Sequence, residues 1–193
     1  MALTIDLETG RTAFVDSVRG FVAAVDGLDE WALLGASRCH GWTRLDVVTH
    51  VLAGWQEMLS GFVSPVDDQP SVDAASYWPA FDEVDDDDPV LVLMAQRRRT
   101  AAYARPDDAR RELRDVADAV LRGAASCADR PLSWQGHVFT AGDFLTIWAV
   151  EDVLHQLDLL TDPPVPSSAL DLASATVAAL DGAVLADRLP TPS

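Results

Sequence analysis

The sequence contains no lysine, and its 14 basic residues, all arginine, stand against 31 acidic residues. The resulting formal charge of −17 repels phosphate backbones and anionic lipid headgroups, and no basic stripe offsets it. We therefore expect no nucleic-acid partner and no role at a membrane surface. Arginine in place of lysine, beside abundant alanine and valine, also indicates a GC-rich bacterial source of the actinobacterial kind.

Long apolar runs and cysteine-rich motifs are also missing. No stretch approaches the ~20 consecutive apolar residues that a membrane helix needs, and the N-terminal segment MALTIDLETG lacks the basic start and apolar run of a signal peptide. The two cysteines, Cys39 and Cys127, lack metal-ligand spacing to each other and are interpreted as reduced thiols. These features predict a cytoplasmic protein.

Strand signals are poor as well, because no convincing alternation of polar and apolar residues lies between turn pairs, and no sheet is predicted. Helix starts are well marked instead. In three places a Ser or Thr that can cap a backbone N–H stands three residues before an acid that can reach back. These pairs are Thr43 with Asp46, Thr140 with Asp143, and Ser168 with Asp171. Asp88 followed by Pro89 marks a fourth start.

The helical pattern covers most of the 193 residues, and 49% of them are hydrophobic, which is enough for one core. We predict helices near residues 8–26, 44–62, 89–126, 141–161 and 169–188. Gly27 ends the first helix, and Pro106 should kink or split the third. The expected fold class is all-α, a four-helix bundle with an additional C-terminal helix, in a single domain over residues 1–193.

Two segments allow more than one interpretation. Residues 63–88 form a long acidic loop with three prolines, too long for an ordinary helix connection, and are either a solvated crossover or a lid over a site. Apolar residues on the last predicted helix either close the core or form a homodimer interface. They are Val177, Leu180, Val184 and Leu185.

Three side chains point to a metal site. Glu151 and His155 lie four residues apart, on one face of a helix that is apolar around most of its circumference. A buried carboxylate and imidazole need an ion pair, a hydrogen-bond network or a metal. His50, on the predicted second helix, is the candidate third ligand, and Gly54 one turn later leaves space for a ligand. The alternative is that His50 is an edge histidine paired with Asp46 or Glu57.

The stretches around these side chains resemble a known family. RCHGWTRLDVVTHVLAG at residues 38–54, TAGDF at 140–144 and EDVLHQLDL at 151–159 are similar to the N-terminal domain of mycothiol-dependent maleylpyruvate isomerases, in the wider DinB-like group of metal-binding four-helix bundles. The resemblance covers roughly residues 10–165. It implies a metal, usually zinc, held by His50, Glu151 and His155. Asp158 matches an Asp that commonly follows the second histidine, whereas Leu157 replaces the usual Trp.

Two histidines and one carboxylate are a catalytic type of ligand set, because they leave coordination positions for water or substrate. Zinc is the first choice, and Ni²⁺, Fe²⁺ or Mn²⁺ would also accept these ligands. The resemblance implies mycothiol, a low-molecular-weight thiol, as cosubstrate. Metal coordination turns a thiol into a thiolate nucleophile for a small electrophile. Addition to a conjugated cis-alkene followed by elimination would make the protein an isomerase, and displacement of a leaving group would make it an S-transferase.

Two other functions remain open. In a metal-dependent hydrolase, metal-bound water would be the nucleophile and Glu57 or Asp158 the base, so these two residues are the candidate catalytic groups. In a non-catalytic helical interaction module, the core around His50 should be dry and filled.

Four other features are interpreted as structural. Arg97, Arg98 and Arg99 could bind a substrate carboxylate, but a solvated patch pairing with the acidic loop is favoured. His40 and His137 are expected at the surface, and Cys39 is expected to be buried and unreactive.

Overall fold

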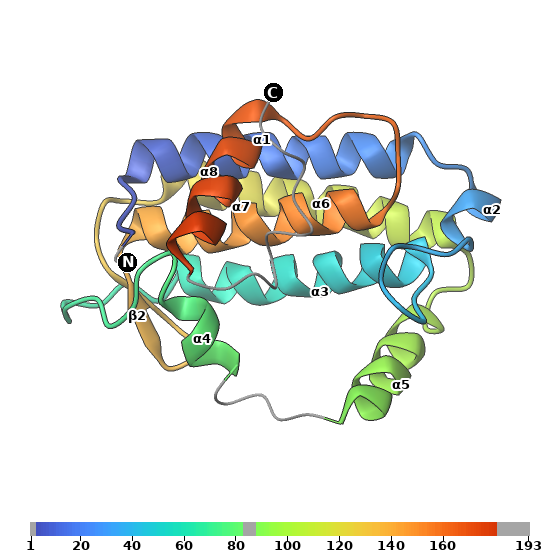
Figure 1. Ribbon diagram of the computed structural model, residues 1–193, viewed down its shortest axis with the longest axis horizontal. Coiled ribbons are helices and arrows are strands. Elements are labelled where there is room, and N and C mark those ends of the chain that lie inside the picture. Colours follow the sequence, from blue (N-terminus) through green and yellow to red (C-terminus); the bar gives the residue numbers. More distant parts are fainter. Residues whose placement is uncertain (1–2, 83–87, 181–193) are drawn as a thin grey trace.

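The structure is a computed structural model, and it describes residues 3–82 and 88–180. Four long helices lie side by side (Figure 1). They are α1 (Leu7–Asp26), α3 (Arg44–Phe62), α6 (Pro106–Ser126) and α7 (Ala141–Asp158). α1 packs on α6 and α7, and α3 packs on the same two helices from the other side. The predicted all-α bundle is therefore confirmed, with the first two predicted helices nearly residue for residue.

α7 is the central helix. Fifteen of its residues are buried, on all sides of the helix, as the apolar sequence predicted. Thr140 caps its start by accepting a hydrogen bond from the Asp143 N–H, and the Asp143 carboxylate in turn accepts from the Ile5 N–H at 2.8 Å. The start of α7 is thus tied to the segment that precedes α1.

The additional C-terminal helix is α8 (Ser167–Ala179), which packs on α7 and α1. The capping pair predicted at its start is wrong. α8 follows Pro166 without a side-chain cap, and the Ser168 hydroxyl donates to Asp16 on α1 at 2.5 Å instead. Val177 is buried, which favours its role in the core, whereas Val184 and Leu185 lie outside the described residues. A homodimer remains a prediction.

Pro106 splits the predicted third helix into α5 (Pro89–Thr100) and α6. Asp88 caps α5 through the Val90 N–H, and proline occupies the first turn of both helices, where a missing N–H is tolerated. A short helix, α2 (Glu30–Leu33), lies between α1 and α3.

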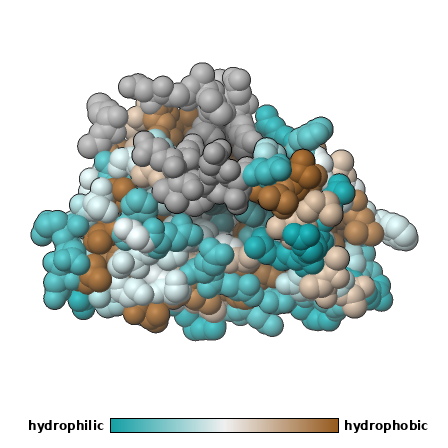
Figure 2. All heavy atoms as spheres, turned by 90° about the horizontal axis from the view of Figure 1, so that it is seen from below, coloured by the Kyte–Doolittle hydropathy of each residue, from teal (hydrophilic) through white to brown (hydrophobic). Residues whose placement is uncertain are grey.

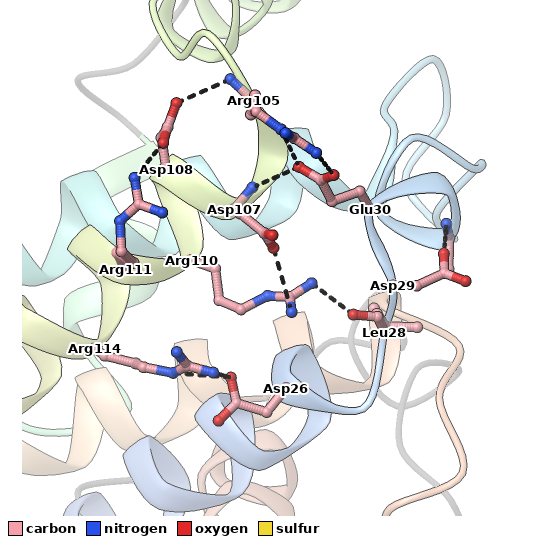
Figure 3. A network of polar contacts seen from close by, with 11 residues as sticks. Asp26, Leu28, Asp29, Glu30, Arg105, Asp107, Asp108, Arg110, Arg111 and Arg114 are labelled. Atoms are coloured by element: carbon pink, nitrogen blue, oxygen red, sulfur yellow. Dashed lines mark hydrogen bonds and ion pairs between the residues drawn. The ribbon is translucent and has the colours of Figure 1, made fainter.

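Ion pairs connect α2 and the end of α1 to the start of α6 (Figure 3). Arg105 donates to the Glu30 carboxylate, and Arg114 reaches Asp26 at 2.7 Å. Arg110 donates to the Leu28 carbonyl at 2.5 Å. These contacts seat the first turns of α6 against the loop that follows α1.

The prediction of no sheet is wrong for one hairpin. β1 (Leu132–Trp134) and β2 (His137–Phe139) pair antiparallel through a two-residue turn. Gln135 and Gly136 both have positive φ in this turn, as the primed hairpin turns require. Strands of three residues are too short to show alternation, which is why the sequence did not reveal them. Trp134 and Phe139 bring aromatic rings from the hairpin into the core.

The segment 63–88 is not a plain loop. It contains α4 (Tyr77–Asp82), and the N–H groups of Ser71 and Val72 donate to the Val138 carbonyl of β2. α4 and the hairpin lie at the same end of the bundle (Figure 1). The acidic residues 83–87 lie outside the described residues. No helix in the described part of the chain combines the length and the apolarity needed to cross a bilayer.

Candidate metal centre

The structure brings the three candidate ligands together. His50 comes from α3, and Glu151 and His155 come from successive turns of α7. Their ligand atoms all lie within 4.8 Å of one another. The Glu151 Oε2 atom is 3.1 Å from His155 Nε2, and the imidazole rings of His50 and His155 meet edge to face with centroids 4.8 Å apart. Residues a hundred positions apart in the sequence therefore form one cluster.

Local chemistry at the start of α3 fixes the position of His50. Thr43 and Asp46 form the predicted capping box, and the Thr100 hydroxyl on α5 donates to the other Asp46 oxygen at 2.6 Å. The Asp46 carboxylate is thus engaged away from His50, and among the described residues Glu57 makes no ion pair with it. The edge-histidine alternative finds no support.

His50 is half-buried and electrically neutral. Burial lowers its pKa to about 4, and the positive charge of His155 adds to the effect. Its ring contacts the Trp42 ring edge to face at 5.2 Å, and no described residue forms a hydrogen bond with its nitrogens. A neutral imidazole with a free lone pair, aimed into a cluster with a carboxylate, is suited to bind a metal.

His155 has a carboxylate at each nitrogen. Nε2 faces Glu151, and Nδ1 lies 3.3 Å from Asp158 Oδ2. Burial opposes the charged form, but hydrogen bonds with Asp158, Cys39 and Glu151 outweigh it and hold the pKa of His155 well above its usual value. A carboxylate behind the distal nitrogen of a histidine is the usual arrangement that orients a metal ligand.

Asp158 and Glu57, the candidate bases, lie in different surroundings. Asp158 is 2% exposed and sits behind His155, whereas Glu57 is exposed and lines a cavity beside the cluster. The geometry suits Asp158 for positioning His155 and leaves Glu57 within reach of a bound small molecule.

Cys39 belongs to the site, although sequence reasoning expected an inert thiol. Its Sγ lies 3.1 Å from Asp158 Oδ2, and Cys39, Asp158 and His155 form a second group with ligand atoms within 4.8 Å. Cys39 is half-buried, in a loop that also bonds to the end of α7 through the Arg38 N–H and the Asp158 carbonyl. Because 119 residues separate it from Asp158, no local spacing could have revealed the contact.

Asp152 is a second residue that sequence reasoning missed. It follows Glu151 on α7 and lies beside the cluster, where it accepts hydrogen bonds from the Ser17 hydroxyl (2.7 Å) and the Trp55 indole N–H (2.8 Å). Burial raises its pKa to about 7, against the effect of both hydrogen bonds. Asp152 therefore joins α7 to α1 and α3 directly behind the cluster.

Two cavities adjoin the candidate ligands. A small one of about 20 Å³ is lined by all three ligands and has room for a single ion or water. A larger one of about 230 Å³ is lined by His50 and Glu151, with Glu57 and Arg99 as further charged groups. Its remaining walls are mainly aromatic, from Tyr77, Trp78, Trp134 and Trp148. The residues present thus fit a metal with an adjacent binding site for a small molecule.

Gly54 has a different role from the one predicted. It does line the cavity, but the Trp148 ring fills the space beside it, since an added Cβ would stand 2.9 Å from that ring. The glycine allows α3 and the Trp148 ring to approach closely.

The arginines and histidines that were interpreted as structural have different positions relative to the cavity. All three arginines are exposed, but Arg99 lines the larger cavity, whereas Arg97 donates to the Gly41 carbonyl and Arg98 lines no part of the cavity. Pairing of these arginines with the acidic residues 83–87 stays a prediction, because those residues are outside the described ranges. His40 is exposed as expected, but His137 is half-buried against the Tyr77 ring.

Comparison with known proteins agrees with this geometry. The family model of the mycothiol maleylpyruvate isomerase N-terminal domain matches residues 14–160. Two solved structures are similar: the mycothiol-dependent maleylpyruvate isomerase (TM-score 0.61, 16% identity) and a histidine-to-alanine mutant of it (TM-score 0.62, 15% identity). Each match covers 88% of this chain and 70% of the other.

A search of curated protein sequences gives no significant match. At 15–16% identity the structural likeness concerns the fold, and it confirms the expected DinB-like four-helix bundle. The family match spans most of the chain, from the first bundle helix to the end of the helix that carries Glu151 and His155. The chain therefore belongs to the mycothiol maleylpyruvate isomerase N-terminal domain family.

Proposed function

We propose that this protein is a metal-dependent enzyme that uses a low-molecular-weight thiol, mycothiol, in an isomerase or S-transferase reaction on a small electrophile. One observation carries the proposal: two imidazoles and a carboxylate converge beside a cavity large enough for a small organic molecule. Family membership supports the choice of thiol, since the solved relatives are named as mycothiol-dependent maleylpyruvate isomerases.

The donor set of His50, Glu151 and His155 favours zinc, with Ni²⁺, Fe²⁺ or Mn²⁺ as the other candidates. A divalent metal held there would lower the pKa of a thiol and make it nucleophilic near neutral pH. Asp158 would accept a hydrogen bond from Nδ1–H of His155 and so direct Nε2 toward the cluster. The neutral His50 would offer its lone pair at no cost in proton release.

The cavity walls supply the rest of the chemistry. Four aromatic side chains, with rings tilted or edge to face to one another, make an apolar wall for a conjugated substrate. Thiolate addition to a cis-alkene conjugated with a carbonyl forms a C–S bond and moves the π electrons to that oxygen. Rotation about the new single bond and loss of the thiolate return the trans isomer, with no net redox change. Glu57 is the carboxylate on the wall that can take up and return a proton.

A metal-dependent hydrolase is the second candidate, because Glu57 on the cavity wall could equally serve as a base for water. Thiol dependence of activity separates the two, since a hydrolase turns over without mycothiol. The interaction-module hypothesis required a filled core around His50, and the cavity lined by His50 speaks against it.

The test is elemental analysis of tag-free protein prepared without chelator, beside His155→Ala and the exposed control His40→Ala. We expect about one equivalent of zinc in the wild type and in His40→Ala, and a large loss in His155→Ala. Assays with mycothiol and cis-alkene acids follow on the zinc-loaded protein. No metal uptake by the wild type after exposure to zinc would refute the proposal.

A further inference from the structure

α5 is attached to the bundle by polar contacts. Its apolar residues Val90, Leu91, Val92 and Met94 are 41–63% exposed, whereas its one buried residue is Gln96. Figure 2 shows the face that carries α4 and α5, with hydrophobic and strongly hydrophilic residues side by side at the α5 end. A surface helix normally buries its apolar residues. The burial of a glutamine instead indicates that another requirement fixes this helix.

Gln96 is held by α3, next to the candidate metal ligand. Its amide nitrogen donates to the Asp46 carbonyl at 2.7 Å and to the Thr49 hydroxyl at 2.8 Å. One turn on, Thr100 bonds to Asp46 and Thr49 as well. Thr49 directly precedes His50. The C-terminal half of α5 is thus fixed against the same turn of α3 that positions His50.

This arrangement orients Arg99. Both amide hydrogens of Gln96 point to α3, so its oxygen is left to accept from Arg99 Nη1 at 2.8 Å. Arg99 in turn lines the 230 Å³ cavity together with His50 and Glu151. A buried, fully bonded amide therefore places one guanidinium on the cavity wall and leaves its other N–H groups available.

Arg99 lacks the carboxylate partner that several other arginines of this acidic protein have. Arg105, Arg110 and Arg114 pair with acids, as Figure 3 shows, but in residues 3–82 and 88–180 no Asp or Glu lies within ion-pair distance of Arg99. After burial and the charges of His155 and Glu151, the Arg99 charge is a further influence on the pKa of His50, so its field reaches the cluster. A positive group beside a cavity with aromatic walls is suited to an anion attached to a flat apolar body.

We propose that Arg99 determines substrate specificity by binding an anionic end, such as a carboxylate, of a molecule in the large cavity, and that Gln96 is its positioning residue. The proposal rests on the proposed function in one respect, namely that the reaction takes place in this cavity. Arg99 can bind a carboxylate through a two-pronged pair of hydrogen bonds, which also fixes the orientation of the substrate relative to His50 and Glu151.

The test uses the tryptophans of the cavity wall as reporters. Maleate and its uncharged dimethyl ester are titrated into the protein, and intrinsic fluorescence is recorded for zinc-loaded and for chelator-treated samples. The variants are Arg99→Gln, Arg99→Lys and the matched control Arg98→Gln. The control removes the same charge at the neighbouring position, which is exposed and does not line the cavity. Thermal melts by circular dichroism establish that all variants are folded.

We expect Arg99→Gln to weaken maleate binding by roughly ten- to a hundredfold, the loss typical of a charge-assisted hydrogen bond. Arg99→Lys should lose less, and Arg98→Gln should stay within about twofold of the wild type because Arg98 does not line the cavity and its charge is screened by solvent. Binding of the ester should be unchanged in every variant. Equal effects of Arg99→Gln and Arg98→Gln, or equal affinity of the wild type for maleate and the ester, would overturn the proposal.

The two proposals fail in different ways. Arg99-dependent maleate binding in a protein that takes up no zinc would refute the metal-dependent function and leave the anion site standing. Normal zinc uptake together with equal maleate affinity in the wild type and Arg99→Gln would refute the anion site and leave the metal-dependent function standing.

Discussion

At the scale of single residues, neighbouring carboxylates on α7 have different surroundings. Glu151 pairs with His155 and lines both cavities, whereas Asp152 borders only the small one and is buried with two hydrogen bonds. A rotation of about 100° per residue along a helix accounts for the difference. One acid is thus available for chemistry while the next holds three helices together.

Asp152→Ala should destabilise the protein strongly. It leaves the Trp55 indole N–H buried without an acceptor, whereas the Ser17 hydroxyl can still donate to the Phe14 carbonyl. We expect the free energy of unfolding to fall by about 1–3 kcal/mol in urea titrations of chelator-treated protein. Glu151→Ala is the matched control and should lose much less. Equal losses in the two variants would show that the buried hydrogen bonds of Asp152 do not add to the free energy of unfolding.

Asp158→Asn should weaken metal binding without abolishing it. The amide oxygen is uncharged and accepts the hydrogen bond of His155 Nδ1–H more weakly than a carboxylate, so the imidazole is less well oriented and less basic. On the proposed function, zinc affinity from competition with a chromophoric chelator should drop about 10–100-fold. Asp162→Asn, at an exposed position four residues on, should change nothing. A loss as complete as that of His155→Ala would mean that Asp158 is itself a ligand.

At the scale of helices and strands, prediction succeeded where the cause is local. Thr43 and Asp46, or Asp88 and Pro89, meet within one turn, so the sequence alone indicates these helix starts. Ser168 failed the same test because a partner on another helix, Asp16, competes for its hydroxyl. Cys39 was missed for the related reason that a residue 119 positions away places it. The hairpin was missed because strands of three residues show no alternation.

The approach of α3 to the Trp148 ring gives a prediction at this scale. In Gly54→Ala the new methyl group would stand 2.9 Å from the ring, which is buried and must shift. We expect a loss of about 1–3 kcal/mol in stability and a changed near-ultraviolet circular dichroism spectrum.

Gly27→Ala is the control for Gly54→Ala, because its methyl group would meet neighbours at 3.5 Å or more and its φ of −72° suits alanine. It should be neutral or stabilising by up to about 1 kcal/mol. If Gly54→Ala proves as harmless as Gly27→Ala, the close packing at Trp148 is not what joins α3 to α7.

At the scale of the whole molecule, the single core couples the ionisation of both tyrosines to folding. The chain has only Tyr77 and Tyr103. Burial, together with the charges of Glu151 and Glu57, raises the pKa of Tyr77 above its ordinary value of 10.0. Burial, followed by the hydrogen bond to Glu112, raises the pKa of Tyr103 to about 12. Both phenols therefore ionise more readily in the unfolded chain than in the folded one.

The sign of the pH dependence follows from these raised pKa values. Below pH 10 both states keep their phenol protons and the tyrosines do not affect stability. Above it the unfolded state ionises first, and the free energy of unfolding falls up to about pH 12 because of Tyr103 and further because of Tyr77. Tyrosinate absorbance of the native protein should stay low past pH 10 and then rise together with the loss of the helical circular dichroism signal. Tyr103→Phe should halve the final absorbance and weaken the fall. Tyrosinate appearing near pH 10 in a still-helical protein would show that the rings are open to solvent.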